Sequence, residues 1–153
     1  MEGFILRIGL ASDHGGYSLK NELKEFIEKE LNHDVKDFGT YGLESVDYPE
    51  YAKLAAEAVK NKECDYAILV CGTGIGISIA ANKVKGIRAA NCHDCFSAEA
   101  TRLHNDANVL TLGERVVGQG LAKKIVSTFL NTEFEGGRHT NRIKQISEIE
   151  NKS

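Results

Sequence analysis

Short apolar runs and amphipathic stretches alternate along the whole chain, and this alternation is its main structural signal. The run from Tyr66 to Cys71 is continuously apolar, which is typical of a parallel strand buried on both faces. Five runs in all predict β-strands, covering about Ile8 to Ala11, Val35 to Phe38, Tyr66 to Cys71, Ile87 to Asn91 and Val109 to Leu112.

Helices are predicted between and after the strands, because apolar residues recur there at the spacing of one helix face. Three stripes carry this prediction: Leu19, Leu23, Phe26 and Ile27; Tyr51, Leu54, Ala55, Ala58 and Val59 after Pro49; and Leu121, Ile125, Val126 and Phe129. Further helices are expected over Ile75 to Lys83, Ser97 to His104 and about Arg138 to Glu150, the last with Ile143, Ile146 and Ile149 apolar. This alternation predicts an α/β fold, a five-stranded parallel sheet with helices on both faces.

Length and composition exclude several classes to which this protein could belong. The 153 residues form one predicted domain, and 42% hydrophobic with 27% charged residues excludes a wholly disordered chain. A net charge of −3 argues against a general nucleic-acid binder, which needs a basic surface. No secretory signal and no apolar run of ~18 residues is visible, so we expect no membrane partner and a cytoplasmic location with four reduced cysteines.

Ligands of parallel α/β sheets bind beyond the carboxyl ends of the strands, so the residues that follow each strand are the candidates. Asp13 and His14 follow the first strand and are succeeded by Gly15 and Gly16, which let the backbone approach a ligand. The alternative for Asp13 is that it only caps the next helix.

A glycine loop, Cys71-Gly72-Thr73-Gly74-Ile75-Gly76, follows the third strand and leads into a predicted helix. Backbone N–H groups there can bind a phosphate or a developing oxyanion. The loop lacks the third glycine of a dinucleotide fingerprint and the Gly-Lys pair of a P-loop. Cys71, before the N-terminus of the predicted helix, has the surroundings of a reactive thiolate. The alternative is that Cys71 is a small buried residue that ends a core strand.

Cys92 and Cys95 form a C-x-x-C pair after the fourth strand, which raises a redox or zinc interpretation. A structural zinc site needs a second pair at similar spacing, whereas Cys64 and Cys71 are seven positions apart. We therefore expect these cysteines to have a structural role and predict no metal site.

Basic residues supply the remaining candidates. Arg115 follows the fifth strand, while Arg138 and Arg142 are four apart and share a helix face, as two guanidiniums that bind one phosphate would. A surface ion pair is the alternative for Arg115, and a solvated basic face is the alternative for Arg138 and Arg142. His104 lies before the fifth strand, and a structural role is its alternative. Taken together, a thiolate, an oxyanion-binding loop, a phosphate site and a histidine suit proton transfer next to the carbonyl of a phosphorylated sugar.

In its motifs the sequence resembles the family of type B ribose-5-phosphate isomerases and allose- and galactose-6-phosphate isomerases. The likeness covers nearly the whole chain, in order. The segments that carry it are Asp13-His14-Gly15, Asp47-Tyr48-Pro49, Cys71-Gly72-Thr73-Gly74-Ile75-Gly76, Ala80-Ala81-Asn82-Lys83, Gly86-Ile87-Arg88-Ala89, His104-Asn105-Asp106, Gly113-Glu114-Arg115-Val116-Val117-Gly118 and Glu135-Gly136-Gly137-Arg138-His139.

The resemblance implies a three-layer α/β/α Rossmann-like sandwich and an aldose–ketose isomerase of the pentose phosphate pathway. It implies an enediolate mechanism without metal or cofactor, with Cys71 as base and with Thr73 and the loop amides, Gly72 to Gly76, holding the enediolate oxygen. Some relatives use a glutamate base beyond the cysteine position, but residues 74–77 contain no acid. His104, helped by Asp13, would open the sugar ring. The implied substrate contacts are His14, Arg138 and Arg142 on phosphate, with Asn105, Arg115 and Tyr48 elsewhere on the sugar.

The predicted function is therefore conversion of ribose 5-phosphate to ribulose 5-phosphate. The alternatives are isomerisation of allose or galactose 6-phosphate, and sugar-phosphate binding by a regulatory module without turnover. The resemblance also implies a homodimer or a dimer of dimers. Topology gives this a role, because Cys71 follows a strand whereas His104 precedes one, at the other edge of the sheet. A two-fold dimer, with the last helix at its interface, would bring His104 and Asn105 of one chain to Cys71 of the other.

Overall fold

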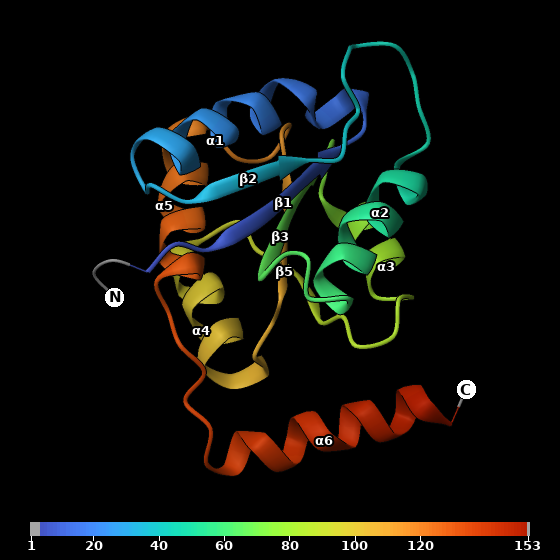
Figure 1. The fold of residues 1–153 in the computed structure, drawn as a ribbon, viewed down its shortest axis with the longest axis vertical. Helices are drawn as coiled ribbons and strands as arrows, with labels where there is room; N and C mark the ends of the chain where they lie inside the picture. The colour runs from blue at the N-terminus through green and yellow to red at the C-terminus, as the bar shows by residue number, and fades with distance from the viewer. Residues whose placement is uncertain (1–3, 153) are drawn as a thin grey trace.

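The computed structural model describes residues 4–152 and contains one five-stranded sheet with all strand pairs parallel, in the order β2-β1-β3-β5-β4. The predicted α/β sandwich is thereby confirmed (Figure 1). The strands are β1 (Arg7–Ser12), β2 (Asp34–Asp37), β3 (Tyr66–Cys71), β4 (Ala89–Asn91) and β5 (Val109–Gly113). The helices are α1 (Tyr17–Lys29), α2 (Tyr48–Lys60), α3 (Ile75–Ala81), α4 (Cys95–Asn105), α5 (Gln119–Leu130) and α6 (Arg138–Asn151), with a 3-10 turn over His14–Gly16.

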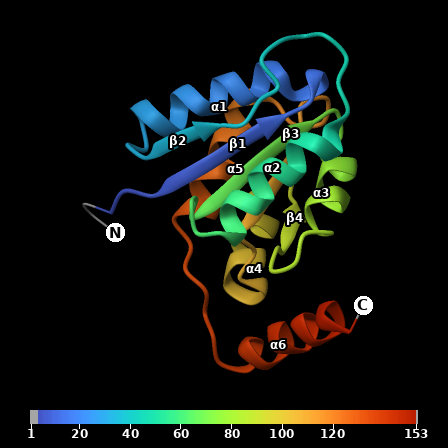
Figure 2. The same cartoon turned by 45° about the vertical axis from the view of Figure 1, so that its right-hand side comes forward.

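Two apolar cores lie on opposite faces of the sheet. One packs α1, α4 and α5 against it, with Leu23, Ile125 and Phe129 fully buried. The other packs α2 and α3, and is built largely from alanines and Ile77. Figure 2 shows the two layers on either side of the strands. Among the described residues, no helix has the length and apolarity to cross a membrane.

Two apolar residues of the predicted helix stripes are exposed, and for Leu54, which was expected in the buried stripe of its helix, the prediction is wrong. Leu54 on α2 and Leu121 on α5 are 46% and 44% exposed. The buried side of α2 is made by the predicted Ala55, Ala58 and Val59 together with Ala52 and Ala56, because small residues let this helix lie close to the sheet. Helical spacing alone does not distinguish the edge of a stripe from its centre.

Two predicted boundaries also differ from the structure. The helix from Ile75 ends at Ala81 rather than Lys83, since Val84 N donates to Ala81 O in a tighter turn. The fourth strand begins at Ala89 rather than Ile87, because Arg88 N donates to the Asn108 side chain. Ile87 is buried all the same, so its hydrophobicity reflects the core and not a strand.

Helix α6 stands apart from the rest of the molecule and crosses its lower end (Figure 1). His139 is its one buried residue within the described part, whereas Ile146 and Ile149 are 48% and 73% exposed. The Glu150 carboxylate at its far end accepts hydrogen bonds from Gly86 N at 3.0 and 3.1 Å. Between α6 and the body lies a cleft of about 560 Å³ that includes Asn105 in its lining.

Candidate active site

Asp13 and His14 are both held in place by main-chain N–H groups. Asp13 Oδ1 accepts hydrogen bonds from Gly15 N at 2.9 Å and Gly16 N at 3.2 Å, so the expected capping role is real. His14 Nδ1 accepts from Val46 N at 3.1 Å, which places the proton of the neutral ring on Nε2. Both side chains therefore have fixed orientations at the carboxyl end of β1.

Cys71 ends β3 and is 5% exposed, as its alternative interpretation required. Its Sγ also accepts a hydrogen bond from Gly74 N at 3.1 Å, which a thiolate accepts more strongly than a thiol. Gly74 has a φ of +81°, and a Cβ there would lie 2.3 Å from Asn91 Oδ1. Only glycine allows the turn that aims this N–H at the sulfur.

The remaining candidates of this edge surround the same loop. Thr73 Oγ1 accepts from Ile75 N at 3.2 Å, and Arg115 N donates to Gly72 O at 3.0 Å. The Arg115 side chain runs past Gly72, 3.6 Å from where a Cβ would be, and the Tyr48 ring lies against Gly76. The structure thus brings together the carboxyl-edge group: Asp13, His14, Tyr48, Cys71, Gly72, Thr73, Gly74, Ile75, Gly76 and Arg115.

The other candidates lie at the opposite edge of the sheet, and we refer to His104, Asn105, Arg138 and Arg142 as the amino-edge group. Cys71 pairs in register with Gly113, the last residue of β5, whereas His104 comes before Val109, its first. Four steps along a strand separate these ends by roughly 13 Å. Figure 1 shows α4 and the start of α6 at this lower end, away from the glycine loop.

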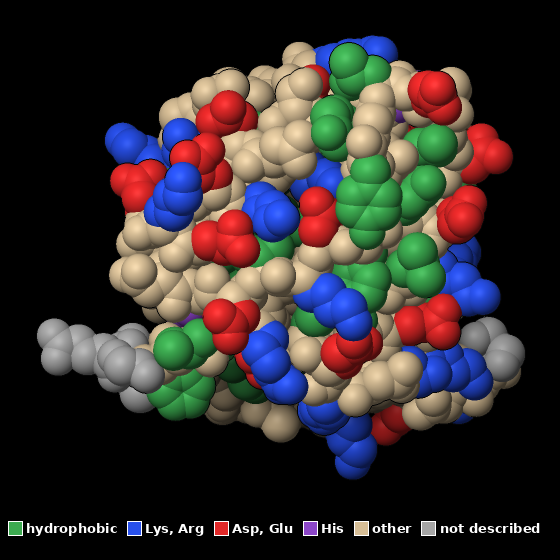
Figure 3. Space-filling view, turned by 45° about the horizontal axis from the view of Figure 1, so that its top comes forward, with side chains coloured by type: hydrophobic (Ala, Val, Ile, Leu, Met, Phe, Trp, Pro, Cys, Tyr) green, Lys and Arg blue, Asp and Glu red, His purple; other side chains and the backbone are tan. Residues whose placement is uncertain are grey.

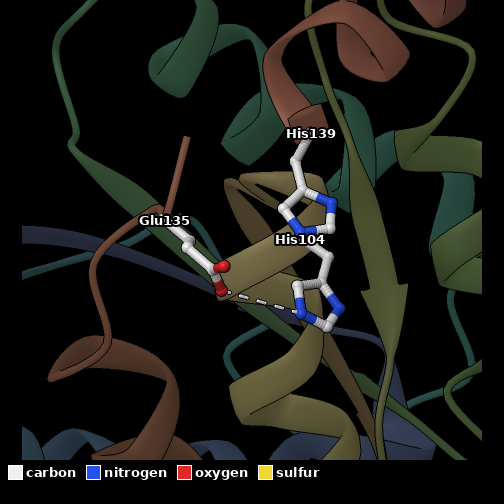
Figure 4. A group of neighbouring side chains, drawn as sticks. All are labelled: His104, Glu135 and His139. Carbon is white, nitrogen blue, oxygen red and sulfur yellow. Dashed lines mark ion pairs between the residues drawn. The ribbon is translucent and has the colours of Figure 1, made fainter. Parts of the chain in front are cut away.

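His104 stacks on His139, with ring centroids 4.3 Å apart and ring planes 22° apart. His104 Nε2 lies 3.9 Å from Glu135 Oε2 (Figure 4). Burial of the His139 ring lowers its pKa, and the neighbouring His104, Arg138 and Arg142 lower it further against the opposing effect of Glu135. The neutral imidazole is therefore favoured at His139.

Cys92 and Cys64 have the character of packing residues. Burial raises the pKa of Cys92 to about 11 and also raises that of Cys64. His93 Nε2, between the two C-x-x-C cysteines, accepts a hydrogen bond from Gly113 N at 3.0 Å. These contacts agree with the structural role expected for the segment.

Some supporting residues gave no signal in the sequence. The Thr111 hydroxyl contacts Gly74 O and Asn91 Oδ1, each at 3.0 Å, and so fixes the glycine loop from β5. Lys20 is fully buried, and its Nζ donates to Asp37 Oδ1 at 2.7 Å and to Thr40 O at 2.7 Å. The one available clue in the sequence was the helical spacing of Lys20, which lies three residues before Leu23 and seven before Ile27 and so falls on the apolar face of its helix.

The fold and its carboxyl-edge group place the chain among α/β proteins that bind ligands beyond the ends of their strands. The model of the Ribose/Galactose Isomerase family matches residues 8–146. The chain belongs to this family, and it is an enzyme of the sugar-phosphate isomerase class. The alternative of a regulatory module without turnover is thereby excluded.

Individual relatives match over nearly their full length. A solved structure of ribose-5-phosphate isomerase B from Clostridium thermocellum is 58% identical, with a TM-score of 0.94, covering 96% of this chain and 99% of that one. Ribose-5-phosphate isomerase B of Escherichia coli is 49% identical over 144 residues, 94% of this chain and 96% of the relative. D-erythrulose-4-phosphate isomerase of Pectobacterium atrosepticum is 41% identical over 147 residues, 95% and 96% of the two chains.

Proposed function

We propose that the protein interconverts ribose 5-phosphate and ribulose 5-phosphate through an enediolate, with Cys71 as the base. The observation that carries this proposal is the Cys71 Sγ that accepts the Gly74 N–H at 3.1 Å beside the glycine loop. The thiolate takes the proton from carbon 2 of the open-chain aldose and later returns it to carbon 1, while the hydroxyl proton of oxygen 2 moves to oxygen 1, so that oxygen 2 becomes the ketose carbonyl and the thiolate is regenerated. Between the two transfers the negative charge of the enediolate lies on the former carbonyl oxygen. Thr73 and loop N–H groups stabilise the charge on that oxygen.

The other candidates have complementary roles. His104, assisted by Asp13, moves the proton that opens the furanose ring. His14, Arg138 and Arg142 bind the phosphate, for which guanidinium groups have matched geometry. Asn105, Arg115 and Tyr48 contact the sugar.

A pentose phosphate is the favoured substrate because relatives named for ribose 5-phosphate are 58% and 49% identical, against 41% for the relative named for a four-carbon sugar phosphate. The test is to incubate the purified protein with ribose 5-phosphate, D-erythrulose 4-phosphate, allose 6-phosphate, galactose 6-phosphate and free ribose, and to follow aldose–ketose interconversion. We expect ribose 5-phosphate to have the highest kcat/KM, free ribose to react very poorly, and a chelator to leave the rate unchanged. A higher kcat/KM with another phosphate would replace the proposed substrate.

We propose further that the active site is shared between two chains of a homodimer, alone or within a dimer of dimers. The carboxyl-edge and amino-edge groups lie at opposite edges of one sheet, yet the proposed chemistry needs His104 beside the sugar that Cys71 deprotonates. A two-fold axis can join the two groups from different chains. Helix α6 would bury Ile146 and Ile149 at the interface.

The surface offers apolar area for such a contact. On the face drawn in Figure 3, charged side chains of both signs are interspersed, and hydrophobic side chains gather on the right, where α2 and α3 lie. Exposed large hydrophobics of α2 and α3 include Leu54, Ile75 and Ile79. An apolar patch of this kind marks an interaction surface.

Subunit exchange tests the shared site. Cys71→Ala and His104→Ala dimers, each inactive, are mixed and allowed to exchange, with exchange followed by native mass spectrometry. If the site is shared, each mixed dimer has one intact site, and activity returns to about a quarter of wild type. If exchange is complete and activity stays absent, each site lies within one chain.

The cytoplasmic location is also a proposal. All four cysteines are free, including Cys95, which is only partly buried. Free thiols persist in reducing compartments, which supports the placement.

A further inference from the structure

His104, Glu135 and His139 form a cluster of potential metal ligands, and Glu135 and His139 have no role in the proposed function. One ligand atom from each residue lies within 4.8 Å of the others. Two imidazoles and one carboxylate are the ligand set of zinc sites that keep a fourth position open. The three side chains come from the last turn of α4, the segment before α6 and the first turn of α6.

His139 supplies an independent indication. The residue is 6% exposed, and its Nε2 is buried without a hydrogen-bond partner. A buried polar nitrogen normally has a partner, since leaving it unpaired costs about 1–3 kcal/mol. Figure 4 shows this ring stacked on His104, with the Glu135 carboxylate beside both rings. A ligand bound between the three residues would satisfy the nitrogen.

The backbone fixes the placement of the ligands, and the side chains leave room for adjustment. Glu135 N donates to Leu103 O at 3.1 Å, so the carboxylate is tied next to His104 through the main chain. Ligand atoms around tetrahedral zinc are roughly 3.3 Å apart, from bond lengths near 2.0–2.1 Å. The cluster must contract, and the nearly parallel rings must turn to converge. The His104 and Glu135 side chains, 45% and 54% exposed, are free to make this adjustment around the buried His139.

We propose that His104, Glu135 and His139 bind a divalent transition-metal ion such as Zn²⁺, and that this ion inhibits the enzyme by occupying His104. The inhibitory part rests on the acid–base role of His104 in the proposed function. Imidazole ligands select zinc, copper or nickel over Mg²⁺, which prefers oxygen ligands in octahedral geometry. Arg138 and Arg142 nearby weaken cation binding, and the Glu135 charge offsets them in part. Because the ion would occupy His104, the site is an inhibitory one, distinct from any requirement for metal in turnover.

The binding arm of the test uses the full-length protein, stripped with a chelator and titrated with Zn²⁺ against a chromophoric competitor. We expect one saturable site per chain, unaffected by Mg²⁺. Glu135→Gln and His139→Gln should each weaken binding roughly tenfold or more. Glu135→Gln changes an exposed side chain, so a folding defect in His139→Gln does not leave the site untested. Glu133→Gln is the matched control, because it removes the same charge from an exposed position two residues away.

Cysteine ligation is the competing explanation, since Cys71 is also able to bind zinc. We expect Cys71→Ala to keep the affinity, and the Co²⁺ form to show tetrahedral absorption without a thiolate charge-transfer band. No saturable binding to wild type, unchanged binding in Glu135→Gln, or loss of binding in Cys71→Ala would each overturn the site.

The activity arm separates this inference from the proposed function. Zn²⁺ should inhibit isomerisation over the concentration range in which it binds, and Glu135→Gln should need about tenfold more Zn²⁺ for the same inhibition. Full turnover with the site saturated would overturn the inhibitory role while the binding result stands. If no sugar phosphate is turned over, the proposed function fails, and the binding arm still decides the metal site.

Discussion

At the carboxyl edge of the sheet, Asp13, His14 and Cys71 each accept hydrogen bonds from main-chain N–H groups, whereas the amino-edge group stands on exposed helix ends. The glycine loop is further held by Thr111, and its glycines leave no space for a Cβ at Gly74. In contrast, the contacts of the His104 ring are a stack on His139 and a distance of 3.9 Å from its Nε2 to Glu135 Oε2. The carboxyl-edge side chains are therefore held by the main chain, whereas the amino-edge side chains are exposed and held by fewer contacts.

Under the proposed function, this difference suits Cys71 at the carboxyl edge and the two arginines at the amino edge to different kinds of work. A rigid group suits the proton transfer, because a base must hold its geometry in the transition state. Exposed guanidinium groups such as those of Arg138 and Arg142 suit substrate capture, since phosphate binding contributes equally to ground state and transition state. Mutations at the two edges should therefore change different kinetic constants.

The largest expected effect is at the rigid edge. Cys71→Ala should lower kcat by roughly 10²- to 10⁴-fold with little change in KM, because it removes the base and leaves the phosphate contacts in place. Cys64→Ala, Cys92→Ala and Cys95→Ala, assayed by the same steady-state kinetics, are the controls and should keep turnover. A Cys71→Ala enzyme with near wild-type kcat would remove the thiolate mechanism.

At the exposed amino edge, Arg138→Ala and Arg142→Ala should raise KM by roughly 10- to 100-fold and change kcat much less. Each substitution removes the proposed charge-assisted hydrogen bonds to a phosphate that does not react. Lys144→Ala, an exposed cation on the same helix, is the matched control. If kcat fell and KM stayed constant, the division of work between the edges would be wrong.

The two edges should also differ in how much a glycine-to-alanine substitution lowers the free energy of unfolding. Gly74 and Gly136 both have a left-handed φ, +81° and +75°, so alanine costs about 1–2 kcal/mol at either. A Cβ at Gly74 also collides with Asn91 and the Leu112 backbone, whereas at Gly136 the nearest atom is 3.9 Å away. Gly74→Ala should therefore lose about 1–3 kcal/mol more than Gly136→Ala in denaturant unfolding. Equal losses would mean that the loop is not tightly held.

The smallest effect is a pH dependence from the packed core beside the rigid edge. Burial raises the pKa of Cys92 from its ordinary value of 9.0 to about 11, so between these values the unfolded chain has lost a proton that the folded chain keeps. Stability should then fall as pH rises through this window. Cys92→Ala should show a shallower fall of Tm between pH 9 and 11 than wild type. Parallel profiles would contradict the burial effect.

The strands and the carboxyl-edge group were predictable from the sequence, because both follow from local rules. A continuous apolar run predicted β3, and the residues directly after it lie where the strand-end rule places them. The separation of His104 from Cys71 along β5 was predictable for the same reason.

The supporting contacts were not predictable, because they join distant parts of the chain. Thr111 and Gly74 are 37 positions apart, and Lys20 binds Asp37 across 17 positions. Likewise, the stack of His104 on His139 depends on where α6 returns to α4, which no local pattern records. The exposure of Leu54 shows the same limit, since small residues on α2 decide which side approaches the sheet.

The order of the strands also determines when the site takes shape during synthesis. β5 lies between β3 and β4 and pairs with both, but it is made after them. The ribosome releases the chain from its N-terminus at about 5–20 residues per second, so β4 waits without its neighbour until β5 emerges. Thr111, which holds the glycine loop, arrives with that late strand. A nascent chain that stops before β5 thus exposes an apolar strand edge, the kind of surface that chaperones recognise. Its glycine loop also lacks the hydrogen bond from Thr111.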